Sequence, residues 1–287
     1  MAFNLQTFKT RALTAVIFVV VMLAGLLWNQ WSFLILFSVI HFGCWVEYQK
    51  LIGLIDAEYK EISPLHRYGV MLIGFGIMLW MTDETYHIGT LRVALVGWSM
   101  FWVGLIGFIL SEFLIAKKLS PKLWAHSILG LLYISLSWGL MIQLFGNLEG
   151  RALTGNAWML PVLLIASIWI NDTMAYLVGS FIGKTALSPV SPKKTWEGTI
   201  GGAILAVLIV TGVGVYALAI SAKALLLISV TAAITGTLGD LFESKLKRLA
   251  GVKDSGQIMP GHGGFLDRFD SLLVATTAVW LVLYILY

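Results

Sequence analysis

Long apolar runs separated by short polar segments dominate this sequence. A helix that crosses the hydrocarbon core of a bilayer needs about 20 predominantly apolar residues, and nine runs come close to or exceed that length. They cover residues 11–27, 31–51, 67–81, 91–115, 124–146, 157–182, 198–220, 222–239 and 269–287. The runs predict an all-α fold, that of a polytopic integral membrane protein with about nine transmembrane helices.

The composition excludes a soluble protein. Hydrophobic residues make up 59% of the chain and charged residues 12%, whereas a soluble globular domain carries roughly 25% charged residues. The first apolar run follows Lys9 and Arg11, as the apolar region of a signal peptide would. Leu27, Trp28 and Asn29 provide no small-residue cleavage site after it. We therefore expect this run to be the first membrane helix.

The lysines and arginines indicate an orientation. If the N-terminus is cytoplasmic, 16 of the 19 basic residues fall on the cytoplasmic side, and only Arg92, Arg151 and Lys223 fall on the other. Short loops rich in Lys and Arg stay in the cytoplasm. We expect the N-terminus inside, the C-terminus outside and the cytoplasmic (inner) membrane as the location. The net charge of +4 then belongs to cytoplasmic loops, and no basic patch interleaved with aromatic residues suggests nucleic-acid binding.

We expect one membrane domain with two regions. Residues 1–155 would form N-terminal transmembrane helices without chemical function. Residues 156–287 would form a catalytic region with cytoplasmic loops at 183–197 and 240–270. The second loop concentrates five of the 15 acidic residues, Asp240, Glu243, Asp254, Asp267 and Asp270, with five basic residues among them. Cations that meet phosphate oxygens, beside carboxylates that hold a hard divalent ion, suit a polyanionic, metal-bound ligand.

Asp172 lies near the middle of the apolar run 157–182. By the 1.5 Å rise per residue, it is on the order of 15 Å from the end of that helix. A charged residue at that depth is costly unless it faces a polar cavity or a cation. Asn171 beside it favours a polar pocket, and an interhelical hydrogen bond from a neutral acid is the alternative.

Two glycine-containing segments resemble phosphate-binding loops, and only the second fits. Gly179 to Thr185 resembles a Walker A loop, but three residues separate Gly179 from Gly183 where four are required, and the segment follows a predicted membrane helix rather than a strand. We reject a P-loop there. The segment 260–264 contains three glycines, which allow backbone N–H groups to approach an anion closely. A plain tight turn is the alternative.

The polar residues of the last third form a pattern of fixed spacing. It reads Ser244-x-Leu246-Lys247-Arg248-x4-Lys253-Asp254-x-Gly256-x3-Pro260-x-His262-Gly263-Gly264-Phe265-x-Asp267-Arg268-Phe269-Asp270. This pattern resembles the signature of the phosphatidate cytidylyltransferases, also called CDP-diacylglycerol synthases. The stretches 191–198 and 172–176 resemble two further blocks of that family. Met259 and Met174 depart from the family's usual residues, but neither position would supply a polar group.

The resemblance implies a reaction in phospholipid biosynthesis. CMP would pass from CTP to phosphatidate in the membrane, giving CDP-diacylglycerol and pyrophosphate. It also implies a magnesium-dependent, multi-span enzyme that is commonly a homodimer, with a metal site involving the aspartates that correspond to Asp240 and Asp267.

The metal and phosphate roles follow from that reaction. Asp240 and Asp267 would hold Mg²⁺ against the CTP phosphates, and Asp172 or Asp270 would complete the shell or hold a second cation. The cations expected to neutralise the triphosphate and the lipid phosphate are Lys193, Lys194, Lys253 and Arg268. The residues expected to shape the phosphate loop are His262, Gly263 and Gly264.

Four more residues are expected to bind substrate. Ser191 and Thr195 belong to the upstream family block. Lys247 and Arg248 would either contact substrate or attract the anionic membrane surface, at about 1 kcal/mol each.

Other functions stay open at this point. A related CTP-dependent membrane enzyme would act on another acceptor, as a polyprenol kinase or an ether-lipid cytidylyltransferase does. An ion-coupled transporter would use Asp172 and Asp240 as midplane ion sites, and a non-catalytic scaffold would need none of these carboxylates. Gly198-x-x-x-Gly202 would pack helices closely, within one chain or between two copies.

Overall fold

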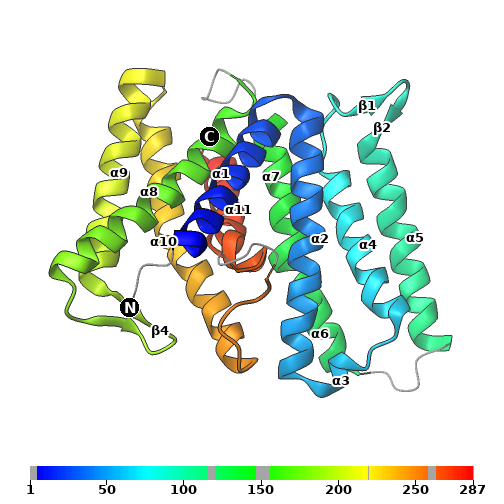
Figure 1. Ribbon diagram of the computed structural model, residues 1–287. Helices are drawn as coiled ribbons and strands as arrows, with labels where there is room; N and C mark the ends of the chain where they lie inside the picture. The colour runs from blue at the N-terminus through cyan, green and yellow to red at the C-terminus, as the bar shows by residue number, and fades with distance from the viewer. Residues whose placement is uncertain (1–4, 115–119, 147–155, 219, 258–262, 287) are drawn as a thin grey trace.

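The computed structural model of the protein describes residues 5–114, 120–146, 156–218, 220–257 and 263–286, and most of these residues are helical (Figure 1). The helices are α1 (Leu5–Leu27), α2 (Gln30–Ile55), α3 (Ala57–Lys60), α4 (Pro64–Trp80), α5 (Val93–Leu114), α6 (Pro121–Gly130), the π-helical η1 (Leu131–Leu136), α7 (Ser137–Gly146), α8 (Met159–Ile182), α9 (Trp196–Leu218), α10 (Ala222–Leu249) and α11 (Leu266–Leu286). Two short antiparallel hairpins are β1 (His87–Ile88) with β2 (Leu91–Arg92) and β3 (Ala186–Ser188) with β4 (Ser191–Thr195).

Seven helical segments in the described part of the chain are long and apolar enough to cross a membrane. They are α2, α5, the segment Pro121–Phe145 that α6, η1 and α7 form together, and α8 to α11. The apolar part of α1, Leu13–Leu27, is shorter, and α4 has 17 residues. The structure confirms a helical, polytopic membrane protein. The count of nine spans, which needs α1 and α4 to cross as well, stays a prediction.

The helices pack in two groups around a shared core. α4 packs against α5 on one side of the molecule, and α8, α9 and α10 pack together on the other (Figure 1). Between these groups, α2, α7 and α11 bury large aromatic side chains, among them Phe37, Trp45, Trp138 and Phe269. The rings of Trp138 and Phe269 lie 5.7 Å apart between their centroids and join α7 to α11. This contact fixes α11, which carries much of the polar site.

Glycines bring α9 close to α8. A Cβ on Gly198 or Gly202 would overlap Ala175 of α8, and Gly179 of α8 lies opposite Gly198. Small residues at such a contact let two helix backbones approach each other in a membrane. Gly198 and Gly202 therefore pack two helices of one chain, the first of the two alternatives that the sequence left open.

The segment 240–270 contains the ends of two helices, so the prediction of a loop over its whole length was wrong. α10 continues to Leu249 and α11 begins at Leu266, which leaves 250–265 as the connection. Hydropathy falls at the start of this segment, but Leu, Glu, Lys and Arg all favour helix. Leu246 also packs into the core. Helix propensity and packing therefore extend α10 beyond its apolar run.

Candidate active site

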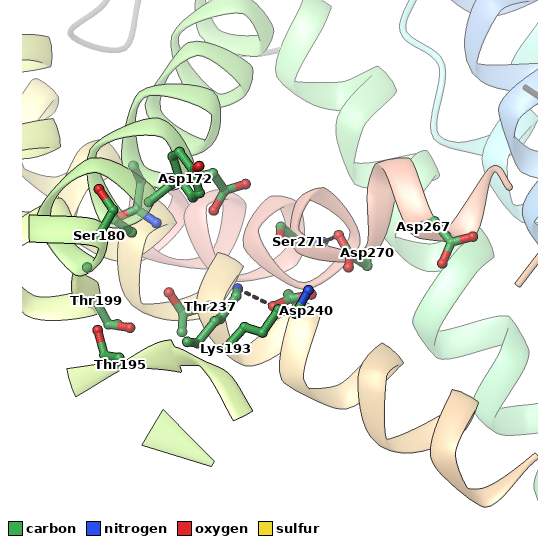
Figure 2. Close-up of a pocket in the computed structure, with 15 residues that line it drawn as sticks. Asp172, Ser180, Lys193, Thr195, Thr199, Thr237, Asp240, Asp267, Asp270 and Ser271 are labelled. Atoms are coloured by element: carbon green, nitrogen blue, oxygen red, sulfur yellow. Dashed lines mark hydrogen bonds and ion pairs between the residues drawn. The ribbon is translucent and has the colours of Figure 1, made fainter. Parts of the chain in front are cut away.

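A cavity of about 440 Å³ lies where α8, β4, α9, α10 and α11 meet (Figure 2). The fold thus gathers the three stretches of sequence that carry the family resemblance. The charged residues that line the cavity are Asp172, Lys193, Lys194, Asp240, Asp267 and Asp270. The hydroxyl groups that line it belong to Tyr176, Ser180, Thr195, Thr199, Thr237 and Ser271. The four predicted metal ligands, Lys193, Lys194 and Thr195 therefore share one cavity.

The segment predicted as the first cytoplasmic loop is a hairpin that carries the two lysines. β4 runs antiparallel to β3 and ends at Thr195, whose Oγ1 accepts the backbone N–H of Gly198 at 3.2 Å. Glu197, in the first turn of α9, fastens the base of the hairpin. Its carboxylate accepts the hydroxyl of Thr185 at 2.8 Å and the backbone N–H of Lys184 at 3.1 Å. These bonds fix where β4 points its side chains.

Opposite charges meet inside the cavity. Lys194 of β4 forms an ion pair with Asp240 of α10 (Figure 2). Asp270 lines the same cavity as Asp240, and its Oδ1 accepts the backbone N–H of Ser271 at 2.6 Å. Asp172 reaches the same cavity from α8, which provides the polar surroundings that its depth in an apolar run requires.

Asp267 lies in the first turn of α11, and both of its carboxylate oxygens are hydrogen-bonded. Oδ1 accepts a bond from Lys247 Nζ at 2.7 Å, and Oδ2 accepts the backbone N–H groups of Ser255 at 2.8 Å and Gly264 at 2.7 Å. Lys247 also forms an ion pair with Glu243, one turn earlier on α10. The side chain of Lys247 is only 13% exposed. It therefore binds these two carboxylates, and its predicted contact with substrate stays a prediction.

The carboxylates of the cavity suit a hard cation such as Mg²⁺, which prefers oxygen ligands. Among the described residues, no three Asp, Glu, His or Cys side chains group closely enough to hold a metal by themselves. Mg²⁺ is usually bound by one or two carboxylates, with waters and substrate phosphates completing its shell. Asp240, Asp267 and Asp270 line one cavity, and Oδ1 of Asp267 accepts a hydrogen bond from the side chain of Lys247. The donor set thus fits a metal that the substrate helps to bind.

The glycines before α11 contact carboxylates of the protein itself. Gly263 has φ of 83°, a left-handed conformation that favours glycine. The N–H of Gly264 donates to Asp267, and a Cβ on Gly256 or Gly264 would overlap the carboxylate of Glu47. The structure therefore gives Gly264 a partner other than the substrate phosphate that the sequence suggested.

A second cavity of about 330 Å³ shares Asp172, Asp267, Asp270 and Ser271 with the first, and Arg268 also lines it. Its other walls are mainly apolar and come from α1, α8 and α11. They are formed by Phe18, Val19, Met22, Ile165, Ile168, Trp169, Phe269 and Leu272. A charged cavity that continues into an apolar one can accept an amphipathic ligand, with its anionic end among the lysines and carboxylates.

The remaining predicted site residues take other positions. Arg248 and Lys253 are exposed, at the end of α10 and in the connection after it, and Ser191 begins β4. None of these three is among the described residues that line either cavity. His262 lies outside the described residues, so its role stays a prediction.

Glu47 of α2 was missed by the sequence analysis. It is buried, and its carboxylate accepts hydrogen bonds from three residues that lie more than 200 positions later in the chain, Ser255, Phe265 and Leu266. An ionisable residue inside an apolar run is in itself a signal of function. That signal was overlooked when residues 1–155 were expected to be structural only.

Comparison with known proteins agrees with these observations. The model of the cytidylyltransferase family matches residues 9–286. A phosphatidate cytidylyltransferase of Thermotoga maritima is 33% identical over 267 residues, covering 85% of this chain and 91% of the relative. One from Staphylococcus saprophyticus is 32% identical over 270 residues, covering 92% and 95%, and one from Bacillus subtilis is 48% identical over 118 residues, covering 40% and 44%. Since the family model spans nearly the whole sequence, this chain belongs to the cytidylyltransferase family.

Proposed function

We propose that this protein is a phosphatidate cytidylyltransferase, which transfers CMP from CTP to phosphatidate and releases pyrophosphate. The observation that carries the proposal is the pair of joined cavities. One holds lysines and carboxylates that suit a metal-bound triphosphate, and the other offers apolar walls that suit acyl chains. Relatives with this name match the chain over most of its length.

The reaction needs charge neutralisation more than it needs a base. A phosphate monoester has a second pKa near 6, so the lipid phosphate is already largely dianionic at neutral pH. One of its oxygens attacks the α-phosphorus of CTP, the new O–P bond forms, and the bond from that phosphorus to the β-phosphate oxygen breaks. Pyrophosphate leaves with the bonding electrons. Two anions must meet in line, so positioning and electrostatic stabilisation dominate the rate.

The lysines of β4 and Arg268 are placed to neutralise the phosphates. Lys193 and Lys194 line the charged cavity, and Arg268 lines the apolar one near its junction with the first. Lys194 forms an ion pair with Asp240. We propose that these three cations bind the triphosphate and the lipid phosphate, and that the exposed Lys253 contributes from the connection.

The proposed metal ligands are Asp240 and Asp267, with Asp270 or Asp172 completing the shell or holding a second cation. All four carboxylates line the same cavity. Bound Mg²⁺ would neutralise the phosphate oxygens of CTP and of the leaving pyrophosphate. The protein's own contribution is to hold these carboxylates within α8 and α10 and near the start of α11.

The reaction is tested by measuring pyrophosphate release from detergent-purified protein with CTP, Mg²⁺ and phosphatidate, each omitted in turn. We expect release only when all three are present, with a CDP-lipid as the product on thin-layer chromatography. A polyprenol kinase would release CDP instead, and an ether-lipid cytidylyltransferase would release pyrophosphate only with its own acceptor. No release from folded, lipid-replete protein with phosphatidate would overturn the proposal.

We also propose that nine helices cross the cytoplasmic membrane and that the site faces the cytoplasm, where CTP is found. The support is the bias of lysines and arginines in the sequence. The single native cysteine, Cys44, is buried, so introduced cysteines can be labelled selectively. Ser188→Cys in β3 should react with a membrane-impermeant maleimide only in inside-out vesicles, and Arg92→Cys in β2 only in intact cells. The reverse pattern would contradict the orientation.

A further inference from the structure

Glu47 contacts the segment that leads into α11 at three points. The backbone N–H of Phe265 donates to its Oε1 at 2.9 Å, and the backbone N–H of Leu266 donates to its Oε2 at 2.9 Å. The hydroxyl of Ser255 lies 2.7 Å from Oε2. The residue is 7% exposed. A buried carboxylate is costly unless donors surround it, and these three donors meet that need.

The donors are also those that the start of a helix must satisfy. The first N–H groups of a helix have no partner within the helix and carry partial positive charge. α11 begins at Leu266, so Glu47 supplies from α2 the acceptor for the N–H groups of Phe265 and Leu266, and its charge adds to that of Asp267 in the first turn. The position and direction of the first turn of α11 therefore depend on a residue of the N-terminal half.

Ser255 connects Glu47 to the site. Its hydroxyl lies 2.7 Å from Glu47 Oε2 and 2.9 Å from Asp267 Oδ2, but it has one proton to donate. The shorter contact favours donation to Glu47, and the N–H of Ser255 donates to Asp267 at 2.8 Å. One residue thus orders both carboxylates at once.

The carboxylate of Glu47 also explains why glycine stands at positions 256 and 264. A Cβ on Gly256 would overlap Glu47 Oε1, and a Cβ on Gly264 would overlap Glu47 Oε2. The connection passes so close to this carboxylate that no side chain fits at either position. Glu47, Gly256 and Gly264 therefore form one packing unit although Glu47 is remote from the glycines in sequence.

We infer that Glu47 is a positioning residue for the active site: its carboxylate fixes Ser255 and the first turn of α11, and so aims Asp267, Arg268 and Asp270 into the two cavities. Glu47 itself lines neither cavity among the described residues. The catalytic part of this inference rests on the proposed function. The structural part, an anchored start of α11, stands apart from it.

The test compares Glu47→Gln with the matched control Glu112→Gln. Glu112 is also a buried carboxylate of the N-terminal half, with His66 Nδ1 at 3.0 Å and Trp124 Nε1 at 3.1 Å, but it lines neither cavity. Glutamine at position 47 would turn an amide N–H₂ toward one of the N–H groups that the carboxylate accepts. A misplacement of about 1 Å at a reacting centre costs about 100-fold in rate.

We expect Glu47→Gln to lower kcat by about 10- to 100-fold, with KM for CTP changed by less than about threefold because the lysines of β4 are untouched. Amide hydrogen exchange of the peptide over 263–268 should accelerate in Glu47→Gln and stay unchanged in Glu112→Gln. The control should lower the unfolding temperature and keep kcat. These measurements are made below the unfolding temperature of all variants.

Two outcomes would overturn the inference: kcat of Glu47→Gln within twofold of wild type, or unchanged exchange over 263–268. If Glu47→Gln does not fold, Ser255→Ala replaces it, because this change removes one of the three donors and leaves the carboxylate in place. It should accelerate exchange over the same peptide by a smaller factor, and no acceleration there counts against the inference. If the wild-type protein does not turn over CTP, the proposed function fails, while the exchange measurement still decides whether Glu47 anchors α11.

Discussion

Replacing Asp267 by asparagine separates the chemical role of this residue from its structural one. The Oδ2 position accepts backbone N–H groups from Ser255 and Gly264, at 2.8 and 2.7 Å. An asparagine must keep its carbonyl oxygen there. Its amide N–H₂ then faces Lys247 Nζ, which lies 2.7 Å from Oδ1 in the native structure. The substitution removes one charge-assisted hydrogen bond and one negative charge, and it retains the other contacts.

The structural loss is moderate. A hydrogen bond to a charged group contributes about 1.5–3 kcal/mol. For a chain of this size, that lowers the unfolding temperature by about 3 to 12 °C. Lys247 keeps Glu243 as a partner, so the cation is not left alone. The variant should therefore fold, bind detergent normally and unfold cooperatively below the wild-type temperature.

The catalytic loss should be much larger. If Asp267 helps to hold the metal against the CTP phosphates, its loss removes transition-state stabilisation of about 3–4 kcal/mol, or about 10²- to 10³-fold in kcat. Pyrophosphate release at saturating CTP and phosphatidate measures the rate, and a Mg²⁺ titration should give a higher half-saturation concentration than wild type. Glu84→Gln, which removes an exposed carboxylate paired with Arg92 at 3.0 Å, is the control and should leave both quantities unchanged. Near wild-type turnover in Asp267→Asn, or loss of rate with an unchanged Mg²⁺ requirement, would refute the metal assignment.

Three further predictions concern stability. Lys247→Met leaves Glu243 and Asp267 without their shared cation, and breaking such a buried pair costs about 3–5 kcal/mol; an unfolding temperature equal to wild type in a thermal melt would contradict this. The ammonium of Lys122 holds the pKa of Asp56 below its usual value. The ion pair therefore stabilises the folded protein fully above the unfolded-state pKa of Asp near 3.9, and this contribution is lost as the pH falls through the lower pKa of the folded state. Because Lys122 is 66% exposed, the effect is at most about 1 kcal/mol; Lys122→Gln should reduce the loss of stability on acidification to pH 2, and an identical pH profile would disprove the coupling. Gly202→Leu should separate α9 from α8 because even a Cβ at this position overlaps Ala175. Cross-linking between cysteines on the two helices should then give a lower yield than in the control Gly212→Leu, since nothing lies within 4 Å of a Cβ added at Gly212.

The amino-acid sequence determined the class of protein and the region of its chemistry. Apolar runs predicted the membrane helices, because in lipid a chain must satisfy its backbone groups within each helix. Charges that interrupt such runs are costly, so the positions of Asp172 and of the acidic residues after Gly239 were enough to predict a polar cavity. Lysines and carboxylates at fixed spacing then indicated a phosphate ligand and a metal.

Only the tertiary structure decided which of these groups meet. Lys194 and Asp240 are 46 positions apart in the chain, and hairpin β3–β4 makes them an ion pair. Lys247, which the sequence assigned either to substrate or to the membrane surface, pairs with Glu243 and Asp267. It also brought Glu47 from the other half of the chain to the start of α11. Hydropathy records how deep a side chain lies, whereas a hydrogen bond between distant segments depends on how helices pack, and no local pattern in the sequence specifies that packing.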